Sequence, residues 1–319
     1  MSKSALLKSS IAKKYWMALT GLFLCLFLVG HLLGNLQLVL KTGEEGRRAF
    51  NEYAYFMGHN ILIKIMAYVT YISIIFHAVD GFVLTFKNKK ARPQGYAYER
   101  ADKNSKLPSR YMAILGTVVL VFICTHMANF WWKQKVKGDV PMHFIVKEST
   151  ESTQNPMDGQ PMNIDLVQKF VLTTDGSYKP YSVTYPSTAN NMVLQNVGVE
   201  LGTEMKNLEE KHKTELFDKK TNLKVGEGYK DLHTVVMNFF GHENNGQPTN
   251  DLAWLAVILY TVSMFVLSFH LWHGFASAFQ TLGINHKRYT PFISIFGKAF
   301  AILVPLAFAI IPILIFLNK

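Results

Sequence analysis

The sequence predicts an all-α membrane protein with five transmembrane helices, four of which form a bundle. A helix that crosses a bilayer needs about 20 mostly apolar residues, and five segments of the 319-residue chain reach that length. The mean hydropathy is only +0.12, because a long polar block separates the third segment from the fourth. The five segments are residues 14–40, 61–86, 111–132, 252–282 and 292–317.

The first segment follows several lysines, as the hydrophobic region of a secretory signal does. Its apolar run is much longer than the roughly 7–15 residues of such a region, and no small-residue cleavage site is evident. We therefore interpret it as a helix of the mature chain. Residues 41–59 carry balanced charge with Gly43 and Gly46, which indicates a short outer connection to the second helix.

The polar block is too long for a plain loop, and we interpret residues 133–231 as an extracytoplasmic insertion. Its residues 181–185 favour a strand, and its charged residues 201–216 favour a helix. Turn signals such as Asn155-Pro156 lie between these pieces. After the insertion, Leu232 to Phe240 has the pattern of a short amphipathic helix at the outer interface. The chain thus divides into residues 1–132, 133–231 and 232–319.

The formal net charge of +11 is distributed unevenly. Basic residues crowd the N-terminus and the loops 87–110 and 283–291, whereas residues 133–251 hold 13 Lys and no Arg against 16 acidic residues. The positive-inside rule therefore places the N-terminus and those two loops in the cytoplasm, and the insertion and the C-terminus outside. We expect a multi-pass protein of the bacterial cytoplasmic (inner) membrane. The basic residues are topogenic, and no nucleic-acid partner is inferred.

Four histidines lie inside the apolar segments: His31, His77, His126 and His270. An ionisable side chain within a membrane indicates a functional site by default. Neutral imidazole is an axial ligand of haem iron, so four such residues could make two bis-histidine sites. The chain has no C-x-x-C-H motif, so a haem would be held without covalent attachment.

The depths of these histidines suggest how they pair. Each lies late in its helix, so His31 and His126 come near the outer face and His77 and His270 near the inner face. At 1.5 Å per residue the two levels should differ by roughly 10–20 Å. Nearby glycines would allow a flat macrocycle to approach, and equally would allow close helix packing without a cofactor. These glycines are Gly30, Gly34, Gly81 and Gly274.

His273 follows His270 by three residues, so from spacing alone either side chain could face the inner site. A solvated or interfacial position is expected for the other histidines. They are His59, His143, His212, His233, His242 and His286. The two cysteines, Cys25 and Cys124, lie in predicted spans, and no structural disulfide is expected.

The motifs around the four histidines resemble those of a known family, the di-haem cytochrome b membrane anchor of succinate:quinone oxidoreductases (succinate dehydrogenase or fumarate reductase) of the five-helix, single-subunit type. In that family the histidine after Phe in the fourth helix is the ligand, which favours His270 over His273. The insertion has no counterpart in compact family members. The resemblance rests on Gly30-His31-Leu32 with Asn35, Phe76-His77-Ala78-Val79-Asp80-Gly81, Gly116 with His126 ten residues later, and Phe269-His270-Leu271-Trp272-His273-Gly274 before Thr281-Leu282-Gly283-Ile284.

The resemblance implies a division of labour between subunits. This chain would hold two b haems, with His31 and His126 on the outer iron and His77 and His270 on the inner iron. Electrons would pass from an iron–sulfur subunit through both haems to a quinone, with menaquinone expected, or in reverse for fumarate reduction. A partner flavoprotein subunit would carry FAD and the dicarboxylate chemistry, and the Fe–S clusters would lie on the iron–sulfur partner. Membrane lipid surrounds the anchor, and a dimer of complexes is left open.

Quinone reduction takes up two protons, so its site needs ionisable groups near a haem and near water. Glu52 and His59 at the outer rim meet that need, and Asp80, one turn beyond His77, is an inner rival.

Two other functions stay open on sequence alone. One is a haem b anchor of another respiratory complex, and the other is a haem-free transporter that uses the histidines as a proton relay, although the midplane helix breaks typical of transporters are absent.

Overall fold

The computed structural model describes most of the membrane part and portions of the insertion. Nothing is inferred for the remaining positions, which include the loop 92–106, Tyr185, the predicted turn at Asn155-Pro156, His212 and His242. The described residues are 9–91, 107–137, 140, 142–149, 153–154, 161–162, 165–172, 178–184, 208–211, 215–218, 224–241 and 249–317.

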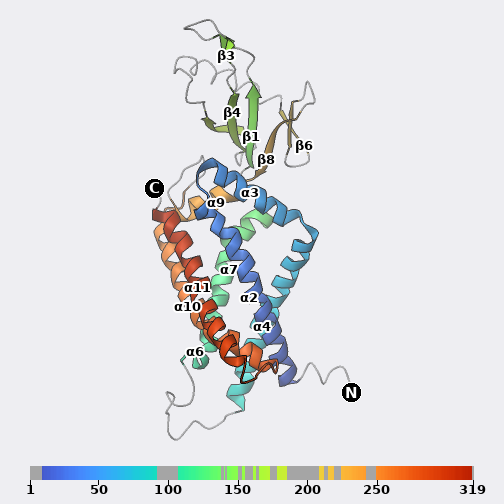
Figure 1. The fold of residues 1–319 in the computed structure, drawn as a ribbon, viewed down its shortest axis with the longest axis vertical. Helices are drawn as coiled ribbons and strands as arrows, with labels where there is room; N and C mark the ends of the chain where they lie inside the picture. The colour runs from blue at the N-terminus through green and yellow to red at the C-terminus, as the bar shows by residue number, and fades with distance from the viewer. Residues whose placement is uncertain are drawn as a thin grey trace.

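Five long apolar helical segments run side by side below the sheet (Figure 1), and each is long and apolar enough to cross a membrane. The prediction of five candidate spans is confirmed, with boundaries that shift by a few residues. The membrane part is therefore all-α. The long helices are α2 (Ser10–Leu40), α4 (Ile61–Lys90), α7 (Met112–His126, preceded by the short α6, Leu107–Arg110), α10 (Ala253–Thr281) and α11 (Thr290–Leu317).

Local chemistry fixes several helix ends. The Asn60 side chain accepts hydrogen bonds from the backbone N–H groups of Leu62 and Ile63, which caps the start of α4. At the other end of the bundle, Gly283 adopts a φ of +80° after α10. Its N–H and that of Ile284 bond back to carbonyls of the last helical turn, a Schellman arrangement that favours glycine.

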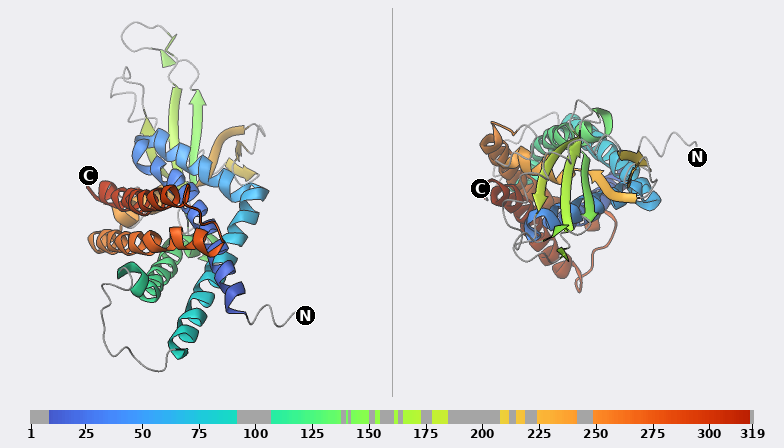
Figure 2. Two further views of the ribbon diagram at one scale, coloured as in Figure 1. Left: turned by 60° about the horizontal axis from the view of Figure 1, so that its bottom comes forward. Right: turned by 90° about the horizontal axis from the view of Figure 1, so that it is seen from above.

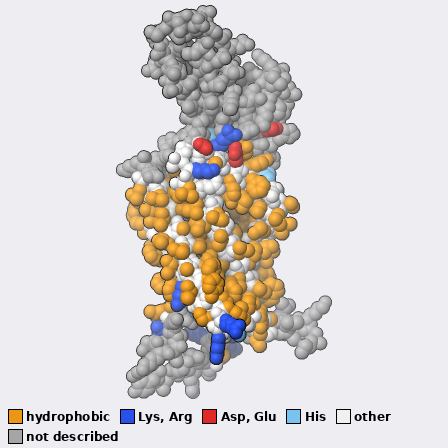
Figure 3. Space-filling view, in the orientation of Figure 1, with side chains coloured by type: hydrophobic (Ala, Val, Ile, Leu, Met, Phe, Trp, Pro, Cys, Tyr) orange, Lys and Arg blue, Asp and Glu red, His pale blue; other side chains and the backbone are white. Residues whose placement is uncertain are grey.

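α11 packs most closely against α10. Its contact face carries small or ring-constrained residues at every fourth position, Gly297, Ala301, Pro305 and Ala309, all buried. A Cβ at Gly297 would lie 2.6 Å from a ring carbon of Phe275, so only glycine allows this approach. Many large apolar side chains instead point outward and cover the sides of the bundle (Figure 3). A bilayer is the solvent that such a surface requires.

α7 changes its geometry directly after His126. Two π-helical turns follow it, η1 (Met127–Trp131) and η2 (Lys133–Lys137). In η1, the Asn129 amide donates to the Tyr260 hydroxyl on α10 at 3.1 Å. Trp131 Nε1 donates to the Tyr71 hydroxyl on α4 at 2.9 Å. Side chains of this one short segment thus donate hydrogen bonds to both α10 and α4. Short π-helical segments are frequent at functional sites.

The short outer connection expected over residues 41–59 consists mainly of a 17-residue helix, α3 (Gly43–His59). It crosses the end of the bundle between α2 and α4 (Figure 1). The helical pattern is weak in the sequence, because three glycines and charges of both signs interrupt the apolar periodicity of this segment. Gly46 is required by packing, since a Cβ there would lie 2.5 Å from the Lys41 carbonyl oxygen.

The described part of the insertion is a sheet that stands beyond α3 (Figures 1 and 2). Its six strands are antiparallel in the order β5-β4-β1-β8-β7-β6, beside a small β2–β3 pair. The strand expected at 181–185 is confirmed as far as residue 184. The strands are β1 (Met142–Ser149), β2 (Thr153–Gln154), β3 (Pro161–Met162), β4 (Asp165–Leu172), β5 (Tyr178–Thr184), β6 (Leu208–Lys211), β7 (Glu215–Asp218) and β8 (Lys224–Lys230).

The helix predicted over 201–216 is wrong for its described residues, which belong to β6 and β7. β7 pairs with β8, and that pairing overrides the helical preference of a Glu- and Lys-rich segment. The short helix after the insertion is confirmed as α9 (Leu232–Phe240). It lies at the same end of the bundle as α3 (Figure 1).

A buried polar network joins the insertion to the bundle. Arg47 on α3 forms an ion pair with Asp231, the residue that caps α9. Asn51, one turn along α3, donates to the same carboxylate at 2.9 Å and accepts from the His233 N–H at 3.0 Å. Arg47, Asn51 and Asp231 are all at most 2% exposed. Sequence reasoning missed this network, although Asp231 directly before an amphipathic run is a recognisable cap signal.

The charge on Asp231 is favoured despite its burial. Burial raises the pKa of this carboxyl, but the hydrogen bonds and charge of Arg47, with help from Asn51 and His143, outweigh it and leave the pKa below its ordinary value of 3.8. A carboxyl whose folded pKa is depressed stabilises the fold above the unfolded value. That stabilisation is lost only as the pH falls through the lowered pKa.

We predict that Arg47→Met destabilises the chain by about 3–5 kcal/mol, because it leaves a buried carboxylate without its counter-ion. Arg48→Met is the matched control. Arg48 is the next residue on α3 and pairs with Glu52 at the exposed surface, where such pairs are worth about 1 kcal/mol or less. Chemical denaturation of the purified chain in detergent measures both losses. Equal losses for the two variants would contradict the docking role of the buried pair.

Candidate functional site

The helices bring the four intramembrane histidines together in two pairs. The rings of His31 on α2 and His126 on α7 have centroids 5.9 Å apart and planes at 82°. The rings of His77 on α4 and His270 on α10 have centroids 6.2 Å apart and planes at 68°. These are the pairs that the depth argument predicts. His270, not His273, is the partner of His77.

The two pairs lie at different levels, and contacts along two helices give the separation. His77 packs against Thr20 and Gly21 of α2, which precede His31 by eleven and ten residues. His270 packs against Gly116 of α7, ten residues before His126. Each spacing corresponds to about 15 Å along a helix. The levels therefore differ by an amount within the expected range.

Backbone and hydroxyl groups orient the His77 ring. Its Nδ1 lies 3.2 Å from the Met17 carbonyl oxygen and 3.3 Å from the Thr20 hydroxyl. Because a carbonyl can only accept, it favours the tautomer that carries the proton on Nδ1 and leaves the lone pair on Nε2. A Cβ at Gly21 would lie 3.1 Å from the ring, so this glycine allows α2 to approach the imidazole closely.

Aromatic rings surround the outer pair. Phe27 stacks on His31 with 5.4 Å between centroids, and Phe308 of α11 lies at 5.6 Å. His126 is enclosed by further rings at 5.3–5.9 Å. The outer pair is thus more apolar in its surroundings than the inner one. The rings that enclose His126 are those of Phe122, Phe130 and Tyr260.

Buried imidazole nitrogens are left unsatisfied in both pairs. Nδ1 of His126 and Nδ1 of His270 are buried and have no hydrogen-bond partner among the described residues. A buried polar atom without a partner is costly and calls for an explanation, such as a bound group. The described residues contain no cluster of three or more His, Cys, Asp or Glu side chains that could hold a bare metal ion. The histidines form pairs instead. Two protein ligands are the number that a haem iron could take, because the porphyrin supplies its other four.

No family model, curated protein or solved structure matches this chain. The site is therefore argued from its own residues.

Asp80, the predicted inner rival for the quinone, is held in an ion pair. Its carboxylate lies 2.8 Å from Lys13 Nζ, with exposed fractions of 7% and 24% for the two side chains. The pair joins α2 to α4 three residues beyond His77. Part of the acceptor capacity of Asp80 is thus already used to hold these helices together.

Glu52 and His59 both lie on α3, on one stripe of the helix because they are seven residues apart. Glu52 accepts from Arg48 Nε at 2.7 Å near the surface. His59 is exposed, and its ring stacks on Tyr55 with centroids 3.9 Å apart. Tyr229 of β8 packs edge-on against the same tyrosine at 5.7 Å. The stripe is therefore in contact with the base of the insertion.

Two other histidines differ from expectation. His143 of β1 is 1% exposed and His233 of α9 is 7% exposed, so both are buried rather than solvated. They lie around the Asp231 network: His143 contributes to the electrostatics of that carboxyl, and His233 contacts Phe50. His286 is exposed as expected and stacks on Tyr289. The cysteines are free, Cys25 buried and Cys124 exposed.

The four glycines singled out from sequence do not touch the histidine rings. A Cβ at Gly30 or Gly81 would meet nothing within 4 Å, so space is open beside them. A Cβ at Gly34 would meet Tyr53 of α3, and one at Gly274 would meet Met112.

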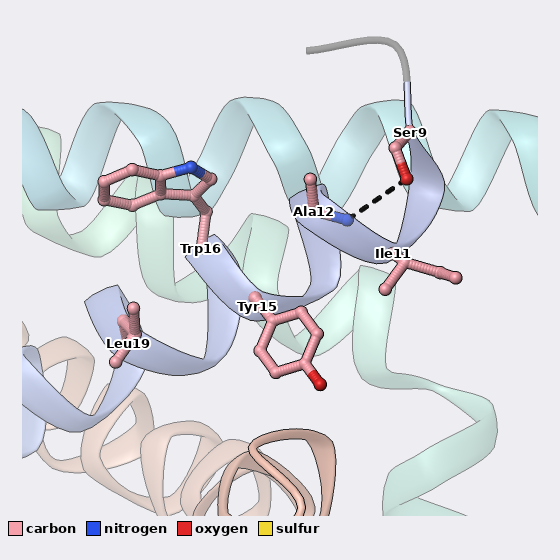
Figure 4. A pocket seen from close by; sticks show the side chains of 6 residues that line it. All are labelled: Ser9, Ile11, Ala12, Tyr15, Trp16 and Leu19. Atoms are coloured by element: carbon pink, nitrogen blue, oxygen red, sulfur yellow. Dashed lines mark hydrogen bonds between the residues drawn. The ribbon is translucent and has the colours of Figure 1, made fainter. Parts of the chain in front are cut away.

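A separate hollow of about 450 Å³ lies on α2 (Figure 4). It is lined by one helix face alone, which holds none of the histidines: Ser9, Ile11, Ala12, Tyr15, Trp16 and Leu19.

Proposed function

We propose that this chain is the membrane anchor and electron-transfer subunit of a succinate:quinone oxidoreductase, with one b haem held by His31 and His126 and another by His77 and His270. The observation that carries the proposal is the pairing of four intramembrane histidines at two levels. Bound haems would supply one-electron carriers between a soluble iron–sulfur subunit and a quinone.

The spacing of the rings fits an iron between them. When two imidazoles bind the same metal ion from opposite sides, with metal–nitrogen distances of about 2 Å, their ring centres lie about 6 Å apart. The observed separations are 5.9 Å and 6.2 Å.

The surroundings of each pair support distinct roles. The Met17 carbonyl fixes the tautomer of His77 and raises the basicity of its free nitrogen, as outer partners of metal-ligating histidines do. The aromatic rings around His31 and His126 exclude water from the outer level.

The charge pattern supports an anchor role. Lys87, Lys89 and Lys90 end α4, and Lys287 and Arg288 follow α10 at the same end of the molecule. We assign this basic end to the cytoplasm, where the flavoprotein and iron–sulfur subunits would dock. The bacterial cytoplasmic membrane is the corresponding location, with the C-terminus and the insertion outside.

Quinone chemistry is placed at the opposite end, on α3. Glu52 is the candidate proton carrier, and its partial exposure gives it access to water. His59 is the weaker candidate because it is exposed and its Nδ1 contacts the Tyr55 carbonyl. Menaquinone is the expected substrate.

A haem-free proton relay is the rival of a different class. A relay needs hydrogen bonds that connect successive ionisable groups. Among the described residues, the hydrogen bonds of His77 lead to Met17 and Thr20 and those of His31 to Asn35, and neither set reaches the other pair. This observation favours cofactor binding.

We predict that Ala at position 31, 77, 126 or 270 removes a haem or prevents assembly, because each iron loses an axial bond. His273→Ala is the matched control on α10 and should retain both haems. Reduced-minus-oxidised spectra and the haem content per purified chain measure the outcome. Loss of the inner haem in His273→Ala with retention in His270→Ala would reverse the assignment, and wild-type protein without b-type bands would exclude the proposal.

Topology gives a second test. A protease site placed within 133–231 should be cut only from the outer side of the cytoplasmic membrane, in spheroplasts, and one within 87–106 only in inverted membrane vesicles. The physical reason is the excess of Lys and Arg in the second segment. Swapped accessibility would invert the depths of both histidine pairs and remove the basis for docking at the basic end.

We predict that Glu52→Gln lowers quinone-linked turnover by about 100-fold or more, since a positioned proton carrier contributes at least that much. Succinate oxidation with a dye that takes electrons from the soluble subunits should persist, as should both haem spectra. Glu45→Gln, at an exposed position seven residues earlier on α3, serves as the control. Unchanged quinone turnover in Glu52→Gln would move the site elsewhere, with the region of Asp80 next.

A further inference from the structure

A second polar site lies at the basic end, beginning one helical turn beyond His270. A cavity of about 190 Å³ is enclosed by α6, the last turns of α10 and the first turns of α11. Its polar lining comes from two helices that run in opposite directions. These side chains are His273, Ser277 and Gln280 of α10, and Ser294 and Lys298 of α11.

Lys298 is the only charged residue in the 28 residues of α11. Its ammonium lies 5.8 Å from the centre of the Trp272 ring, and no carboxylate of the described residues lies within ion-pair distance of it. A lysine inside a membrane helix is normally paired or reaches the interface. Side chains on a helix lean toward its N-terminus, which for α11 is the basic end, so Lys298 is directed toward the headgroup region.

The lining defines the chemistry of the ligand. It offers one fixed positive charge, two hydroxyl groups, an amide and an imidazole, and the described residues that line it include no Asp or Glu. Such a set suits a phosphate, whose oxygens accept several hydrogen bonds and balance the lysine. The volume is below the roughly 300–1,000 Å³ of pockets that enclose a drug-sized molecule. It therefore suits one headgroup rather than a whole amphiphile or a haem macrocycle.

The surroundings indicate that the phosphate belongs to a lipid. On the same turns of α11 as Ser294, three apolar side chains are more than half exposed, and they offer acyl chains a surface in the bilayer. These side chains are Phe292, Ile295 and Phe296. We propose that this cavity binds the headgroup phosphate of an anionic phospholipid at the basic end of the bundle. The proposal needs only the membrane placement of the helices and does not depend on haem.

Native mass spectrometry of the full chain in detergent tests the proposal. With added phosphatidylglycerol, Lys298→Gln should bind the lipid about fivefold more weakly than wild type, as expected for loss of one lysine at a membrane surface. Lys298→Arg should retain binding. Lys64→Gln is the matched control, because Lys64 is exposed on the first turn of α4 at the opposite end and should leave binding unchanged.

Four outcomes would overturn the proposal. Phosphatidylglycerol could bind Lys298→Gln as tightly as wild type. Phosphatidylcholine could bind with the same affinity as phosphatidylglycerol. Inorganic phosphate could displace the lipid at equal concentration, and that displacement would show a site for a free anion. Altered haem spectra in Lys298→Gln with unchanged lipid binding would assign the cavity to the cofactor instead. If Lys298→Gln does not fold, Ser294→Ala keeps the charge, removes one donor, and should still weaken binding.

Discussion

An imidazole inside an apolar helix bundle must find a partner, and in this molecule that constraint shapes the bundle. Four histidines on four helices meet two by two, and each meeting requires the backbones to come close. Gly21 and Gly116 provide that closeness at the inner level, where each lies directly against an imidazole. The fifth helix, α11, bears no histidine and packs through a stripe of small residues instead. It also contributes Phe308 to the outer pair.

Ion pairs hold the helices near the two ends of the bundle. At the basic end Lys13 and Asp80 join α2 to α4, three residues beyond His77. At the other end Arg47 and Asp231 join α3 to the start of α9. The Lys13 side chain is partly exposed, whereas Arg47 and Asp231 are buried, so these two charges depend on each other and on the hydrogen bond from Asn51. The middle of the bundle is left to aromatic and aliphatic contacts, so that an apolar environment surrounds the imidazoles.

The insertion is connected to the part of the bundle where quinone chemistry is proposed. Tyr229 of β8 touches Tyr55, which in turn stacks on His59. On the adjoining face of α3, Arg47 and Asn51 bind the Asp231 carboxylate. One helix therefore carries the proposed proton carrier and the docking surface of the sheet.

The five apolar helices, the four histidines, their relative levels and the short helix α9 follow from the sequence, because length, hydropathy and periodicity are local properties. The sequence also predicts how the histidines pair, since depth follows from helix direction. The helix over residues 43–59, the pairing of residues 208–211 and 215–218 as strands and the burial of His143 and His233 could be recognised only in the folded chain. These features depend on partners distant in the chain. Arg47 and Asp231 are separated by 184 residues, and no local pattern links a basic residue on one helix to the cap of another.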